Sequence, residues 1–104
     1  MNRTVRTVTW SSLLLLAFAG CGGPPQIGAS KEAFKTVDAL YTAVGLRDTE
    51  LVAQCEEGLK KLRDAGSLPA AASESLDSII AEAKGGKWER SLERLGAFME
   101  GQRR

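Results

Sequence analysis

The chain has 104 residues, with 14 lysines and arginines against 13 aspartates and glutamates, two cysteines and no histidine. This length allows one small domain, and the lack of histidine excludes a histidine-based catalytic triad, metal site or proton shuttle. A near-zero net charge argues against a dedicated nucleic-acid-binding protein, and two cysteines are too few for a disulfide scaffold or a four-cysteine zinc site.

The start of the chain has the pattern of a secretory signal peptide. Arg3 and Arg6 precede an apolar stretch from about Val8 to Ala19, and the first acidic residue is Glu32. The apolar stretch is shorter than the roughly 20 residues needed to span a bilayer. A basic start, a short apolar run and small residues after it are typical of a segment that directs secretion.

The end of this segment, Phe18-Ala19-Gly20-Cys21, resembles the lipobox of bacterial lipoproteins. Ala19, Gly20 and Cys21 match the lipobox pattern, and Phe18 is a bulky apolar residue where leucine is usual. The resemblance implies cleavage before Cys21, a diacylglycerol on its sulfur and an N-acyl chain. Gly22 follows, where in well-studied Gram-negative bacteria an aspartate retains lipoproteins at the inner membrane, so the resemblance implies the outer membrane of the cell envelope.

Two other interpretations of the segment remain open. The run Ala17-Phe18-Ala19 also fits an ordinary signal peptidase site, and cleavage before Gly20 would release a soluble secreted protein. The segment could also stay uncleaved as an anchor. A cysteine at the cleavage point, followed by a stretch rich in glycine and proline, favours the lipoprotein.

The organisation expected from these patterns has three parts. Residues 1–20 are a signal peptide, residues 21–29 are the lipidated cysteine and a flexible tether, and residues 30–104 are a small helical domain. Glycine and proline dominate the tether, which carries no charge and no apolar periodicity. It is predicted to be a plain spacer of roughly 20–25 Å when extended, at about 3 Å per residue.

The domain is predicted to be all-α, because apolar residues recur at spacings of three and four and no stretch alternates with period two. Four helices are expected, at about residues 31–44, 49–65, 69 or 70–84, and 88–101. The apolar stripes comprise Phe34, Val37, Leu40, Tyr41 and Val44, then Leu51, Val52, Cys55, Leu59 and Leu62, then Ala72, Leu76, Ile79, Ile80 and Ala83, and finally Trp88, Leu92, Leu95, Phe98 and Met99.

Helix ends are marked by small polar residues and glycines. Ser30 and Asp48 are placed to cap the first two helices, and Ser67 the third. Gly45 is expected to end the first helix and Gly66 to follow the second. The pair Gly85-Gly86 stops the third.

The links between helices are about three or four residues long, which makes consecutive helices antiparallel neighbours. We therefore expect two αα-hairpins, packed as a small bundle or as an array like that of tetratricopeptide repeats. Gly86, Trp88, Ser91 and Leu95 match the spacing of glycine, aromatic, small and apolar residues at the second helix of that repeat. The first hairpin lacks the pattern, which favours a generic pair of hairpins.

Few residues suggest chemistry. Cys55 lies on an apolar stripe, which favours a buried core residue over an intermolecular disulfide. Trp88 is expected to anchor the core at the start of the fourth helix, and Tyr41 to lie at the edge of its stripe. If the domain has a binding surface, the candidate is formed by the grooves flanking the first and fourth helices, near these two residues. The carboxylate pairs Glu56-Glu57 and Glu89–Glu93 fall on polar faces beside lysine or arginine and are interpreted as solvated.

These observations predict a membrane-anchored small bacterial lipoprotein with a non-catalytic interaction or scaffold domain. No catalytic residue, metal or cofactor is expected apart from the lipid on Cys21. The expected partners are the membrane and an envelope protein or a second copy of the chain, and no nucleic acid. The alternatives are a secreted soluble helical protein and a small-ligand carrier with a cavity between its helices.

Overall fold

The computed structural model describes residues 24–102. The predicted signal peptide, its Phe18-Ala19-Gly20 recognition residues and Cys21 lie outside the described residues. Within the described part, four helices and no strand are present: α2 (Lys31–Gly45), α3 (Thr49–Asp64), α4 (Ala70–Lys84) and α5 (Trp88–Glu100). The all-α prediction is confirmed, and each helix begins and ends within one or two residues of its predicted bounds.

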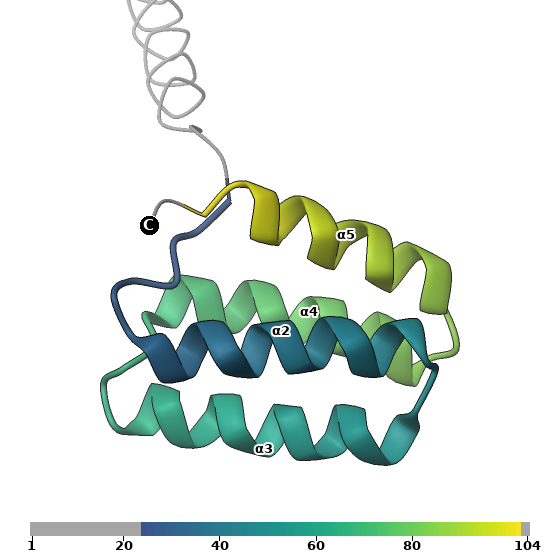
Figure 1. The fold of residues 1–104 in the computed structure, drawn as a ribbon, viewed down its shortest axis with the longest axis horizontal. Helices are drawn as coiled ribbons and strands as arrows, with labels where there is room; N and C mark the ends of the chain where they lie inside the picture. The colour runs from purple at the N-terminus through teal and green to yellow at the C-terminus, as the bar shows by residue number, and fades with distance from the viewer. Residues whose placement is uncertain (1–23, 103–104) are drawn as a thin grey trace, which may run out of the picture.

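The helices form a closed four-helix bundle (Figure 1). α2 pairs with α3 and α4 with α5 as antiparallel hairpins. α3 packs against α4, and α2 and α5, the first and last helices of the described part, also pack against each other. An extended repeat array would leave its first and last helices apart. The ring of contacts therefore places this fold with bundles rather than with tetratricopeptide arrays.

Side-chain caps begin the first two helices as predicted. The Ser30 hydroxyl accepts a hydrogen bond from the Ala33 amide at 3.1 Å, and the Asp48 carboxylate accepts one from the Leu51 amide at 3.0 Å. The prediction that Ser67 caps α4 is wrong. The N-cap of α4 is Pro69, whose side chain has no atom that can accept a hydrogen bond. The Ser67 amide instead donates to the Leu62 carbonyl at 2.8 Å, which makes Ser67 part of the end of α3.

Three helices are each followed, two residues after their last helical residue, by a residue whose φ angle lies in the left-handed region. Gly66 and Gly86 take this conformation, with φ of 80° and 87°, after α3 and α4. After α2 the left-handed residue is Arg47, with φ of 55°. Gly45 ends α2 as predicted, because it is the last helical residue, and the left-handed turn comes two residues later.

The core is mainly aliphatic, and all four described helices contribute to it. Cys55 is only 6% exposed, so its interpretation as a core residue is confirmed, and burial raises the pKa of its thiol. Phe34, Trp88 and Met99 are partly buried against the core, whereas Tyr41 remains 40% exposed. The buried hydrophobic residues are Ile27, Ala33, Val37, Leu40, Ala43, Val44, Val52, Cys55, Leu59, Leu68, Ala72, Leu76, Ile79, Ile80, Ala83, Leu95 and Phe98.

Residues 24–29, called here the N-terminal strap, correct the prediction of a plain spacer. Ile27 is 1% exposed and belongs to the hydrophobic core. Its amide donates a 2.7 Å hydrogen bond to Oε1 of Gln102, and Nε2 of Gln102 donates to the Pro25 carbonyl at 3.0 Å. The composition of the strap is that of a linker, but one buried isoleucine and one glutamine at the other end of the chain hold it on the bundle.

The end of α5 is shaped to receive the strap. A Cβ atom added at Gly101 would overlap the ring of Pro24, so only glycine fits at this position. The Gly101 carbonyl accepts a 2.9 Å hydrogen bond from Nε2 of Gln26. The strap and the end of α5 therefore lie together at one end of the bundle (Figure 1).

No helix of the described residues is both long enough and apolar enough to cross a membrane.

Candidate interaction surfaces of helix α5

Helix α5 carries different polar residues on its two flanks. Ser91, Leu95 and Phe98 face inward and are buried. The flank beside α4 carries Arg90 and Arg94, and the flank beside α2 carries glutamates. Each flank builds a different surface.

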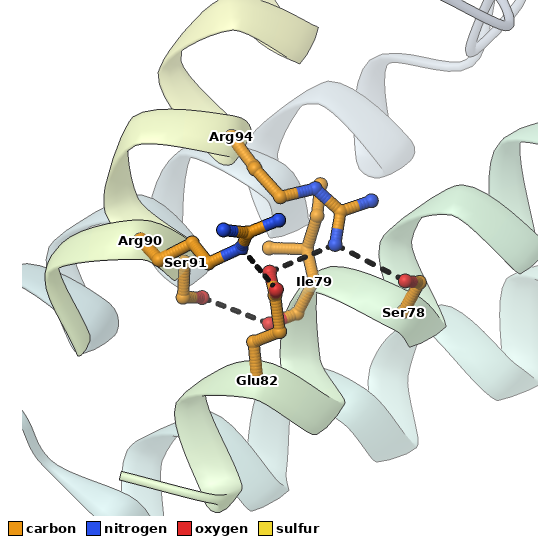
Figure 2. A network of polar contacts seen from close by, with 6 residues as sticks. All are labelled: Ser78, Ile79, Glu82, Arg90, Ser91 and Arg94. Atoms are coloured by element: carbon orange, nitrogen blue, oxygen red, sulfur yellow. Dashed lines mark hydrogen bonds and ion pairs between the residues drawn. The ribbon is translucent and has the colours of Figure 1, made fainter. Parts of the chain in front are cut away.

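Between α4 and α5 the polar residues pair with one another (Figure 2). Oε2 of Glu82 accepts a 2.7 Å hydrogen bond from Nε of Arg90, and Oε1 accepts a 2.8 Å bond from Nη1 of Arg94. Arg94 also donates to the Ser78 hydroxyl at 3.1 Å. One carboxylate thus braces two turns of α5 against α4, beside the buried Ser91.

The hydrogen bond from Arg94 is the main reason that the pKa of Glu82 lies below its ordinary value, and Arg90 adds to the effect. Partial burial of the carboxylate opposes the shift. Because the side chain of Glu82 is only 19% exposed while that of Arg90 is 69% exposed, the pair is reached by water mainly from the arginine side.

The ion pairs of Glu82 with Arg90 and Arg94, called here the Glu82 brace, are expected to lose their contribution to stability in acid. The pKa of Glu82 is lower in the folded chain, so the stabilisation is fully present above the ordinary value of 4.5 and disappears as the pH falls through the folded-state pKa. The melting temperature of Glu82→Gln should therefore lie below that of the wild type at pH 6, and the gap should close as the pH approaches 3.

The control for this pH series is Glu74→Gln, which removes an exposed glutamate of α4 that forms no ion pair with any described residue. A gap between wild type and Glu82→Gln that stayed constant from pH 6 to pH 3 would show that the brace acts through packing and not through charge.

Between α2 and α5 lies an open groove of about 400 Å³, called here the α2–α5 groove. The side chain of Tyr41 forms its α2 wall. The α5 side is lined by Glu89, Leu92, Glu93, Gly96, Ala97 and Glu100. The structure thus places Tyr41 of the predicted binding surface at a groove, whereas Trp88 is half-buried against the core at the start of α5 and does not line it.

A second polar groove, of about 340 Å³, runs between α3 and α4. Nζ of Lys84 donates to the Glu56 carboxylate across it at 2.8 Å, and both side chains are substantially exposed. Acidic and basic residues both line this groove, so it carries no dominant charge. An exposed pair of this kind adds little to stability.

The pairing of Glu82 with Arg90 and Arg94 was missed by sequence reasoning, although a signal for it exists. A helical hairpin that turns at Gly86 brings together residues equally distant from the turn, and Glu82 and Arg90 are each four residues away. Of the groove glutamates, the sequence singles out only Glu89 and Glu93, and it predicts that they are solvated surface residues. Their segregation from the arginines of the same helix becomes visible once α2 and α4 are placed on either side of α5.

Among the described residues no group of three or more aspartate, glutamate and cysteine side chains could hold a metal ion. No protein family, curated protein or solved structure matches the chain.

Proposed function

We propose that the chain is a small lipid-anchored protein of the bacterial cell envelope, and that its helical bundle is a non-catalytic interaction or scaffold domain. The lipobox-like run that ends at Cys21 supports the anchor. This run carries the proposal, and the N-terminal strap determines how close to the bundle such an anchor would lie.

The strap sets the distance between the anchor and the bundle. Pro24 packs on Gly101, and Cys21 precedes it by three residues, which span at most roughly 10 Å at about 3.3 Å each. An acylated Cys21 would therefore hold the bundle close to the lipid surface rather than at the end of a long tether. Two or three acyl chains on one residue give stable anchoring, which a single chain does not.

The test is intact mass spectrometry of the protein extracted with detergent from membranes of the producing bacterium. We expect a chain that begins at Cys21 and carries a diacylglycerol and an N-acyl chain. Cys21→Ser should abolish the lipid mass and the processing that depends on it. Cys55→Ser is the matched control, because it removes the other thiol of the chain and should leave the lipid unchanged.

A soluble species that begins at Gly20 would overturn the anchored function and make the chain a secreted helical protein. A full-length species that keeps residues 1–20 and no lipid would overturn it as well, in favour of an uncleaved anchor.

A further inference from the structure

The charged residues of α5 differ between its two flanks, and only on the flank beside α4 do they form ion pairs with other described residues. Arg90 and Arg94 both pair with Glu82 of α4. Glu89, Glu93 and Glu100 line the α2–α5 groove and form no ion pair with any described residue. No lysine or arginine lines the groove. It is therefore a negatively charged surface that disfavours anionic ligands and attracts cationic ones.

The groove is also partly apolar. The half-buried Leu92 and Gly96 and the exposed Ala97 also line it, and the phenol ring of Tyr41 lies beside Gly96. Tyrosine is among the residues enriched in protein interfaces, where its ring is buried and its hydroxyl keeps a polar contact. The combination of apolar and charged lining residues suits an occupant that is amphipathic.

Gly96 lies in the middle of a helix, where glycine is about 1 kcal/mol less favourable than alanine. Packing within the bundle does not require it, because an added Cβ would meet the nearest atom, Cε1 of Tyr41, at 3.7 Å, an ordinary contact distance. The bundle itself would thus be more stable with alanine. A glycine that lines a groove does allow the backbone of another chain to approach closely.

The groove follows α5 for about three turns. Glu89 and Glu100 lie eleven residues apart on α5, which corresponds to roughly 16 Å at 1.5 Å per residue. Glu89, Glu93 and Glu100 recur at spacings of four and seven, the spacing at which side chains repeat along one face of a helix. A second helix laid along the groove can present lysines or arginines at the same spacing.

We propose that the α2–α5 groove docks a basic amphipathic helix of an envelope partner, with small apolar residues against Gly96 and Ala97 and cationic side chains toward Glu89, Glu93 and Glu100. This inference rests on the proposed interaction role and names the class of partner. It does not depend on the lipid, and its readout is separate from the mass measurement that tests the anchor.

The test uses the mature protein in non-ionic detergent micelles and two fluorescent synthetic helices of 14 residues. One has an alanine and leucine stripe flanked by lysines, and its twin carries glutamate at every lysine position. Fluorescence anisotropy at low salt should show binding of the lysine peptide and none of the glutamate peptide. Binding should weaken as salt rises to 0.15 M, where the screening length is about 8 Å.

Matched variants separate the groove from general charge attraction. Glu93→Lys should weaken binding of the lysine peptide at least tenfold. Glu74→Lys makes the same change of charge on an exposed position of α4 and should leave the affinity within about twofold. Equal losses in the two variants, or no binding of the lysine peptide to the wild type, would overturn the proposal.

The glycine is tested in the same assay. Gly96→Ala should raise the melting temperature and weaken peptide binding severalfold. Gly58→Ala in α3, where an added Cβ would also meet only an ordinary contact at 3.5 Å from Thr36, should raise the melting temperature and leave binding unchanged. Unchanged binding in Gly96→Ala would contradict a close approach of helices at that position.

Discussion

Ile27→Ala is expected to lower the free energy of unfolding by about 2–4 kcal/mol, the range for truncating a large aliphatic side chain in a packed core. Ile27 is 1% exposed although it lies in a segment with the composition of a linker. In a domain of this size such a loss should lower the melting temperature by roughly 10–25 °C. Chemical denaturation followed by circular dichroism measures it directly.

Ile27→Val is the control for this variant, because it keeps a branched side chain in the core and should cost about 0.5–1.5 kcal/mol. If Ile27→Ala melted at the wild-type temperature, the strap would not be part of the folded domain, and the anchor proposed at Cys21 would be joined to the bundle by a loose tether instead.

Ser91→Leu is expected to destabilise the bundle by about 2–4 kcal/mol through two effects. Ser91 is fully buried between α4 and α5, so three further carbon atoms must displace neighbouring groups. The substitution also removes the 2.8 Å hydrogen bond from the Ser91 hydroxyl to the Ile79 carbonyl (Figure 2). Denaturant unfolding gives the free energy, and weaker contact between α4 and α5 should appear in near-ultraviolet circular dichroism.

Two further variants separate the effects of size and hydrogen bonding. Ser91→Ala keeps the size of the side chain and should cost only about 1 kcal/mol, the value of one net hydrogen bond. Ala81→Leu places the same large side chain at an exposed position of α4 and should change stability by less than about 1 kcal/mol. Similar losses for Ser91→Leu and Ala81→Leu would mean that the two helices do not pack closely at Ser91.

The four helices could be predicted from the sequence because their signals are local. Apolar residues at spacings of three and four, the capping side chains of Ser30 and Asp48, and the glycines after α3 and α4 act within one or two turns of the chain. The two helix-end signals that differ from the structure are local as well. Arg47 shows that a left-handed turn does not need glycine, and Ser67 shows that a good capping residue can belong to the preceding helix.

The N-terminal strap could not be predicted, since its folding depends on residues about 75 positions away. A single isoleucine has no periodicity, and nothing near it in the sequence indicates that Gln102 will bond to its amide. The candidate site could be predicted only in part, because it too depends on residues far apart in the sequence. Tyr41 was recognised as an aromatic residue at the edge of a stripe, but the groove beside it exists only because α5 returns to pack on α2.

The contacts of Gln102 make the described chain a closed loop. Its side chain accepts a hydrogen bond from the Ile27 amide and donates to the Pro25 carbonyl and to the Phe98 carbonyl of α5, so the two ends of the described part hold each other. Chain ends usually fray independently of the domain between them. Here neither end can open alone, because loosening α5 releases Ile27 from the core and lifting the strap uncovers the last turn of α5.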